Sequence, residues 1–144
     1  MKRTIFVASL LALGVTAAIA QSNAVEQRQA LMKEMGAQSR TLGSMMRGQA
    51  PFDLAQVQAG LKVFSENSKK AAPLFPESTK GAEKTGALPT IWEKKSEFES
   101  HFAKLDQSAQ AALSAIKDEA TFKAELPKVL GNCGGCHTSF RKSS

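Results

Sequence analysis

Apolar residues recur three and four positions apart in four stretches of this chain. The stretches cover residues 23–48, about 53–72, about 89–117 and about 118–140. This spacing is typical of helices that bury one face against a core. No stretch shows sustained alternation of period two with β-branched residues, and there is no internal repeat. The pattern therefore predicts an all-α fold.

Each stretch has one inward seam, which the spacing identifies. In chain order the seam residues are Val25, Arg28, Met32, Met35, Ser39, Leu42 and Met46; Leu54, Val57, Leu61, Phe64, Ser68 and Ala71; Ile91, Phe98, Phe102, Leu105, Ala109, Ala112 and Ile116; and Phe122, Leu126, Val129, Cys133, Cys136 and Phe140. Arg28 and Ser39 interrupt an otherwise apolar seam, which is costly in a dry core and tolerable beside a polar group.

The connections between these helices predict their arrangement. Gly48 ends the first helix and Asp53 is a candidate cap for the second, while residues 73–89 form the longest loop. Two of the three connections are short, which favours an antiparallel up-down-up-down four-helix bundle. Pro127 lies inside the last stretch, where it either kinks the helix or marks its true start.

The first twenty residues have the features of a secretory signal peptide. Lys2 and Arg3 precede an apolar run, and Ala18-Ile19-Ala20 is a small-x-small cleavage signature. The run is short and has no stop-transfer pattern after it, so we expect no retained membrane anchor. The expected organisation is a cleaved signal peptide at 1–20 and a single exported domain at 21–144, located in the periplasm.

The charge of the chain is moderately positive. Lys and Arg number 19 against 13 Asp and Glu, which gives a formal net charge of +6. The basic residues are spread along the sequence without a dense block. This distribution favours an anionic partner and gives no indication of nucleic-acid binding.

The only two cysteines lie close together near the C-terminus, in the motif Cys133-Gly134-Gly135-Cys136-His137. On a helix the two cysteines and the histidine occupy positions i, i+3 and i+4 and share one face. Two thiols at this spacing can add to the vinyl groups of a haem while the imidazole binds its iron. The motif therefore predicts covalent attachment of haem c.

Three other interpretations of Cys133 and Cys136 compete with haem attachment. A redox dithiol normally opens a helix after a strand, whereas this pair lies deep in a predicted helix. Zinc needs further ligands, and the other histidine, His101, forms no short-spaced pair with a cysteine. A disulfide between the two would close a very small loop and stabilise little.

Segments well beyond the motif resemble the cytochrome c′ family, the class II c-type cytochromes. Class I cytochromes c have the motif near the N-terminus, so its position here is informative. The matching segments are Arg28-Gln29-Ala30-Leu31-Met32-Lys33, Gly48-Gln49-Ala50-Pro51-Phe52-Asp53, Leu88-Pro89-Thr90-Ile91-Trp92 and Cys133 to Arg141. The resemblance implies one haem c, bound through thioethers to Cys133 and Cys136 with His137 as the iron ligand.

The resemblance also assigns roles to three further residues. Arg141 matches a basic residue near the iron-binding histidine, and Arg28 matches an arginine that meets a haem propionate. An alternative for Arg28 is a stem packed on the core with its head in solvent. Met32 matches the position that covers the iron from the other side, where it either only shields the iron or binds it as a sixth ligand.

The expected function follows from these roles. The favoured one is a five-coordinate haem protein that binds small diatomic ligands such as nitric oxide and can transfer electrons. The alternative is a low-spin electron-transfer cytochrome with His137 and Met32 as axial ligands. No general acid or base is placed to assist chemistry at the iron, so we expect no enzyme. Expected partners are a gaseous ligand, a redox partner and, through the first two helices, a second copy of the chain.

Overall fold

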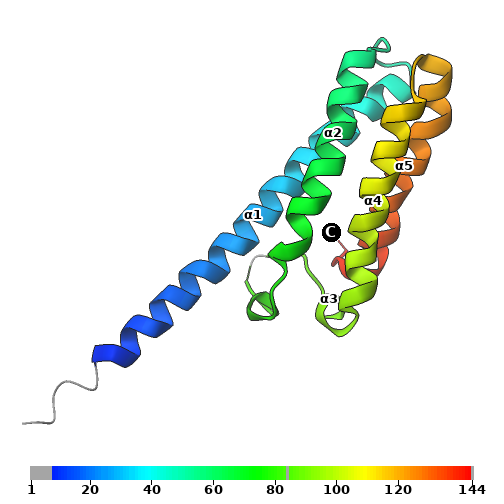
Figure 1. Ribbon diagram of the computed structural model, residues 1–144. Helices are drawn as coiled ribbons and strands as arrows, with labels where there is room; N and C mark the ends of the chain where they lie inside the picture. The colour runs from blue at the N-terminus through cyan, green and yellow to red at the C-terminus, as the bar shows by residue number, and fades with distance from the viewer. Residues whose placement is uncertain (1–7, 84, 144) are drawn as a thin grey trace, which may run out of the picture.

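The computed structural model describes residues 8–83 and 85–143, with side chains from residue 23 onward. Its long helices form an antiparallel four-helix bundle, which confirms the predicted fold class (Figure 1). Within the described residues the elements are α1 (Ala8–Met46), α2 (Leu54–Ala71), two 3-10 turns (Ala72–Leu74 and Glu77–Thr79), the short α3 (Thr90–Glu93), α4 (Lys95–Ala115) and α5 (Glu119–Phe140).

The ends of the helices have local causes. Gly48 adopts a positive φ of 69°, a conformation that glycine adopts without a steric penalty, and it ends α1. The Asp53 side chain accepts a hydrogen bond from the Gln56 amide at 3.1 Å and caps α2. Asp118 and Thr121 form a reciprocal capping box at the start of α5.

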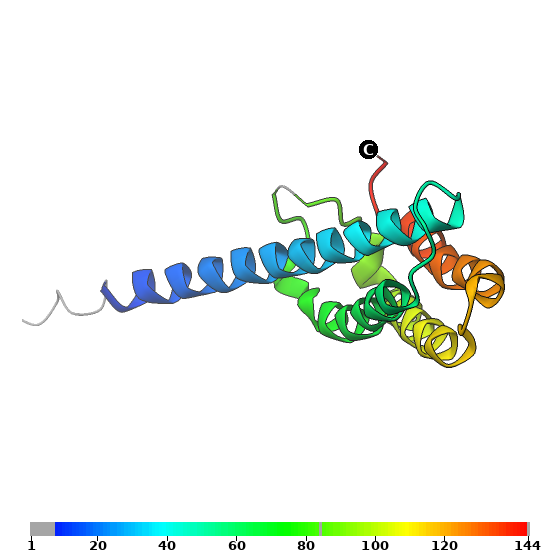
Figure 2. The same cartoon turned by 90° about the horizontal axis from the view of Figure 1, so that it is seen from above.

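The structure differs from the predicted helix boundaries in three places. α1 begins at Ala8 rather than near Asn23, and its N-terminal part extends beyond the bundle (Figure 2). Residues 1–7 of the predicted signal peptide lie outside the described residues. The predicted third helix is interrupted at Lys94, where φ −121° and ψ 46° separate α3 from α4. α5 begins at Glu119 and continues through Pro127, so this proline does not mark its start.

Most of the predicted seam is buried. Exceptions are the half-buried Met32, Ser39, Met46, Leu54, Cys133 and Cys136. Met45, which lies beside the predicted seam, is 4% exposed. The three-four spacing therefore identifies the core well, and most of its half-buried exceptions lie on α1 and α5.

Three pairs of helices pack closely in the bundle. α1 packs on α2, α2 on α4 and α4 on α5, whereas α1 and α5 contact each other much less. α1 also diverges from the other helices toward its N-terminal end (Figure 1). The fold thus leaves α1 and α5 apart along part of their length. No helix in the described part of the chain is both long and apolar enough to span a membrane.

The long connection between α2 and α3 folds against the C-terminal end of the chain. The Leu88 amide donates to the Phe140 carbonyl at 3.0 Å, and the Lys142 amide donates to the Gly86 carbonyl at 2.8 Å. Ala87 and Arg141 form an isolated antiparallel bridge between these bonds. The connection is therefore attached directly to the end of α5.

Candidate functional site

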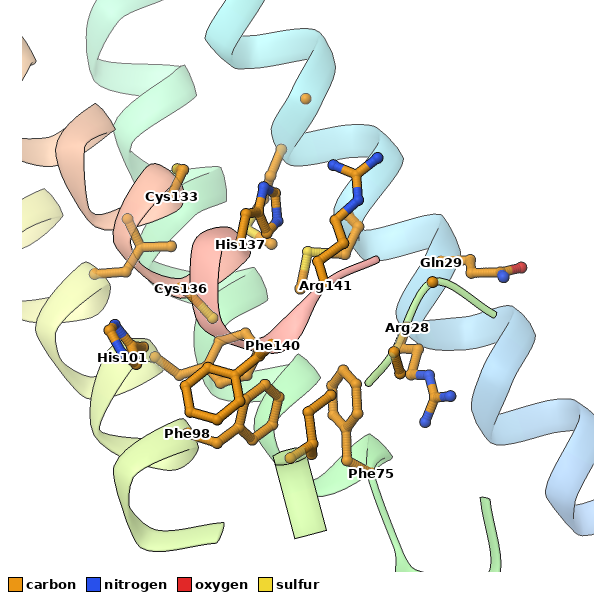
Figure 3. A pocket seen from close by; sticks show the side chains of 18 of the residues that line it. Arg28, Gln29, Phe75, Phe98, His101, Cys133, Cys136, His137, Phe140 and Arg141 are labelled. Carbon is orange, nitrogen blue, oxygen red and sulfur yellow. The ribbon is translucent and has the colours of Figure 1, made fainter. Parts of the chain in front are cut away.

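A cavity of about 510 Å³ lies between α1, α4, α5 and the connection that follows α2. Its size is in the range of small-molecule and cofactor sites. The structure brings all six predicted site residues to its wall, and Figure 3 labels five of them. These residues are Arg28, Met32, Cys133, Cys136, His137 and Arg141.

Cys133 and Cys136 lie one turn apart on α5 and are half-buried free thiols in the structure. Burial raises the pKa of Cys133. Burial and the neighbouring Cys133 raise the pKa of Cys136 to about 11. Reactive dithiols have depressed pKa values instead, so these thiols do not have the electrostatics of a redox pair. Among the described residues, no group of three His, Cys, Asp or Glu side chains is arranged to hold a metal ion.

His137 lies in the last turn of α5 and lines the same cavity. Burial lowers the pKa of His137, and the positive charge of Arg141 lowers it further. The imidazole is therefore mainly neutral near pH 7, which is its metal-binding form. Arg141 directly follows α5, and its side chain extends toward α1 (Figure 3).

Arg28 is 2% exposed, and its guanidinium group is directed at the connection that follows α2. It donates to the Leu74 carbonyl at 3.1 Å, to the Thr79 hydroxyl at 2.9 Å and to the Thr85 hydroxyl at 3.1 Å. Its Cζ atom also lies 4.4 Å from the centre of the Phe75 ring. The alternative that places the guanidinium in solvent is therefore wrong, because these partners enclose it.

α1 contributes a largely apolar stripe to the cavity through Met32, Met35, Gly36 and Ser39. Met32 is half-buried and packs against both apolar clusters of the core. The Ser39 hydroxyl donates to the carbonyl of Met35 at 3.0 Å, so its proton is already used within the helix. The stripe faces the wall of the cavity that α5 forms, and this wall carries Cys133, Cys136 and His137.

Aromatic rings form the floor of the cavity. Phe98 makes edge-on contacts with Phe75, Phe102 and Phe140, at centroid distances of 4.7, 5.2 and 5.3 Å. Such arrangements are favoured by the ring quadrupoles. The rings give this end of the cavity a rigid apolar surface.

His101 has no role in the site predicted from the sequence, yet it lines the cavity. It is half-buried and packs edge-on against Phe140 with a centroid distance of 5.6 Å. Its position three residues after Phe98 and four before Leu105 places it on the seam of α4. That spacing was the feature of the sequence that could have identified it.

The charges of the cavity wall have one sign. Arg28, Lys33 and Arg141 contribute to the wall, and no Asp or Glu does so within the described residues. A flat apolar group that carries carboxylates matches both the aromatic floor and these cations. Haem is such a group, and the cysteines and His137 supply the donors that its covalent form needs. The residues therefore fit haem c.

Comparisons with known proteins agree with this fit. The family model described as Cytochrome C' matches residues 23–141. Cytochrome c′ of Rhodopseudomonas palustris is 45% identical over 94% of this chain and 92% of its own. Cytochrome c-556 of the same organism is 37% identical over 98% of this chain and 97% of its own.

Solved structures show the same relationship. The solved structure of cytochrome c′ from Rhodopseudomonas palustris is 45% identical, has a TM-score of 0.82, and matches over 84% of this chain and 97% of its own. A nitric oxide complex of a mutant cytochrome c prime from Alcaligenes xylosoxidans is 27% identical with a TM-score of 0.74, over 86% of this chain and 97% of its own. The match covers the four-helix bundle and the motif together, and this chain belongs to the cytochrome c′ family.

Proposed function

We propose that this protein is an exported haem c protein whose five-coordinate iron binds small uncharged diatomic ligands such as nitric oxide and exchanges electrons with a redox partner. One observation carries the proposal. A single cavity is lined by the attachment motif on α5 and, from α1, by an apolar stripe without an uncommitted hydroxyl donor. When bound, haem supplies an iron centre that changes its oxidation state and binds a gaseous ligand.

The motif residues hold the group from one side. Cys133 and Cys136 would hold a single haem through thioethers, and the unprotonated ring nitrogen of the neutral His137 would bind its iron. Both thiols are protonated at neutral pH in the free chain. Each thioether would form by addition of S–H across a vinyl group, with the sulfur bonding to one vinyl carbon and the hydrogen to the other. Burial and, to a smaller extent, the positive charge of Arg141 lower the pKa of His137 and so favour its neutral form.

Arg28, the buried cation of the wall, would orient the haem through one of its carboxylates. A guanidinium has five N–H donors, and Arg28 uses three of them in the bonds to the connection after α2. Its remaining donors serve a propionate, and its buried position excludes water from that contact. Arg28 therefore holds both the connection and the haem edge.

The α1 side of the cavity selects the gaseous ligand. Met32 covers the iron without binding it, so that only small uncharged molecules enter. Bound dioxygen is stabilised by a hydrogen-bond donor, and neither Met32 nor the committed hydroxyl of Ser39 offers one. Nitric oxide depends less on such a donor, and the Alcaligenes xylosoxidans relative has been solved as a nitric oxide complex.

The same arrangement favours ligand binding and electron transfer over catalysis. The ionisable residues of the wall are Arg28, Lys33, Arg141, the two histidines and the two cysteines, and none is assigned to proton transfer at the iron. The proposed location is the periplasm, after cleavage of residues 1–20. The proposed assembly is a homodimer through the outward faces of the first two helices.

Absorption spectra of the purified ferric and ferrous protein at neutral pH test the proposal. We expect a high-spin iron in both states and a new spectrum when nitric oxide is added to the ferrous protein. A pyridine haemochrome assay reports one covalently bound haem c per chain. A six-coordinate, low-spin iron in both states refutes the five-coordinate proposal and leaves haem attachment intact.

A second candidate is an electron-transfer cytochrome in which Met32 binds the iron opposite His137. The observation that favours it is that the two residues line one cavity from different helices, Met32 from α1 and His137 from α5. Ligation by histidine and methionine raises the reduction potential. In that case Met32→Ala converts a low-spin spectrum into a high-spin one, and an unchanged spectrum rules the candidate out.

A further inference from the structure

Three basic residues form a row along one face of α1. Lys33, Arg40 and Arg47 are seven residues apart, and this spacing places them on the same side of a helix with a small drift per repeat. All three side chains are exposed. Glu26 occupies the preceding position of the repeat and bounds the row at its N-terminal end. We call these three residues the basic row.

The basic row has no acidic partners. Among the described residues, no Asp or Glu pairs with any of its members. Seven lysines elsewhere do form ion pairs, namely Lys69, Lys70, Lys80, Lys94, Lys95, Lys123 and Lys128. Seven of the twelve lysines whose side chains the structure describes are thus paired locally, whereas the positive charge of the row is directed at the solvent.

The N-terminal part of the row borders the cavity. Lys33 lines it directly, and so does Gly36, over which the Arg40 side chain lies. A Cβ atom on Gly36 would lie 3.6 Å from Nη1 of Arg40, and one on Gly43 would lie 3.1 Å from Nη1 of Arg47. Each guanidinium group therefore lies over the glycine four residues before it in the helix. Glycine inside a helix costs about 1 kcal/mol relative to alanine.

Arg141 extends the positive surface to the other side of the cavity. It is exposed, lines the cavity and extends toward α1 (Figure 3). Like the basic row, it forms no ion pair within the described part of the chain. The cavity therefore opens between two positively charged elements.

We propose that the basic row, together with Arg141, is the docking surface for an acidic face of a redox partner protein. The inference rests on the proposed function, because it requires that electrons enter and leave at the haem in this cavity. Charge complementarity identifies the partner, since an unpaired positive surface attracts and orients a negatively charged protein. Docking here brings the donor to the edge of the cavity.

Two other occupants fit the surface less well. A second copy of the chain docked through this same face would bring two positive rows together, and like charges repel, so the proposed homodimer uses other faces of α1 and α2. A membrane surface would need apolar side chains beside the cations, and the exposed residues of α1 between 23 and 47 are polar apart from Ala30. An acidic protein needs only the charges that the surface offers.

The test measures reduction of the ferric holoprotein by photoreduced flavodoxin, a small acidic electron-transfer protein, in a stopped-flow instrument. The row variant is Arg40→Gln/Arg47→Gln. Its matched control is Lys62→Gln/Lys104→Gln, which removes the same charge from exposed lysines of α2 and α4 that form no ion pair and do not line the cavity. Absorption spectra of both variants establish that the haem site is unchanged.

At low ionic strength we expect the second-order rate constant of the row variant to fall about tenfold, within the range of electrostatic steering. The control changes by less than about twofold, and the three proteins converge when the ionic strength reaches about 0.5 M because salt screens exposed charges. Equal rates in the row variant and the control, or a wild-type rate without salt dependence, overturn the proposal.

Cosedimentation with vesicles that contain phosphatidylglycerol separates the membrane alternative. If the row variant loses vesicle binding while its flavodoxin rate stays at the wild-type value, the surface binds lipid and the proposal is wrong. A purified protein that carries no haem contradicts the proposed function itself. A haem protein with normal spectra and an unaltered flavodoxin rate in the row variant contradicts only the docking surface.

Discussion

Replacement of Arg28 by methionine tests how the cavity is closed. The change removes three hydrogen bonds from a charged donor and the contact with the Phe75 ring. The Thr79 hydroxyl keeps its bond to the Pro76 carbonyl, and the Thr85 hydroxyl keeps its bond from the Ala87 amide. The Leu74 carbonyl loses the donor that Arg28 supplies.

The magnitude follows from these contacts. A buried acceptor left without a donor costs about 1–3 kcal/mol. The cation–π contact contributes about 0.5–2 kcal/mol. Burial keeps the Arg28 guanidinium away from water, which costs free energy and lowers its pKa. Arg28→Met removes this cost and so offsets part of the loss. We expect a net loss of about 2 kcal/mol in the free energy of unfolding.

Urea unfolding of the holoprotein, followed by circular dichroism and extrapolated to water, measures this loss. Arg40→Met is the matched control, because Arg40 is exposed on the same helix and should change stability by less than about 0.5 kcal/mol. Thr79→Val completes a double-mutant cycle with Arg28→Met. A coupling free energy of about 1 kcal/mol is expected for two side chains that share a buried hydrogen bond.

Two outcomes would refute the reasoning. If Arg28→Met is no more destabilising than Arg40→Met, the buried guanidinium does not hold the connection. If the effects of Arg28→Met and Thr79→Val simply add, their hydrogen bond contributes nothing specific, whatever the size of each single effect.

Three further predictions concern the ligand side, one ionisable group and one helix cap. In stopped-flow measurements Met32→Ala should speed nitric oxide binding to the ferrous protein roughly tenfold, as expected if about 1.4 kcal/mol of steric barrier is removed. The resting spin state should not change. The control Met46→Ala, at a residue that does not line the cavity, should leave the binding rate unchanged. The pKa of Asp106 is lowered: burial opposes this, but hydrogen bonds from Ser65, Gln110 and Lys69 outweigh it. The ionised carboxylate of Asp106 therefore stabilises the fold fully at pH values above its unfolded-state pKa, and this stabilisation is lost as the pH falls through its lower pKa in the folded state. In denaturation curves Asp106→Asn should destabilise the fold at pH 7 and progressively less below about pH 4. A difference in stability that does not change with pH would contradict this. Asp118→Ala should lower the midpoint of urea unfolding through loss of the capping box, whereas Asp118→Asn should retain most of the wild-type stability.

The bundle could be predicted because its core positions are local in sequence. Phe64, Phe122 and Leu126 are fully buried on seams that the three-four spacing identifies. The motif likewise follows from helix geometry, since Cys133 and Cys136 are one turn apart. What a helix buries is encoded within the helix, so a single sequence is sufficient to identify it.

Other features could not be predicted because they depend on segments distant in sequence. The partners of Arg28 lie 46 to 57 residues away, in a connection without a regular period. His101 is absent from the predicted site because its place on the seam of α4 indicates that it faces inward, but not that α5 packs over it. The continuity of α1 from Ala8 was missed because an apolar signal-like segment and an amphipathic helix have different patterns, although both are helical.

The attachment of the α2–α3 connection has a consequence for the width of the cavity. α1 and α5 make few contacts with each other, yet both are fastened to this connection, α1 through Arg28 and α5 through the Ala87–Arg141 bridge. At the cavity the two helices are therefore tied together from outside the bundle, by a spacer that is fastened to both. Changes in the length or sequence of residues 72–89 can adjust the separation of α1 and α5 while the core of α2, α4 and α5 remains as it is.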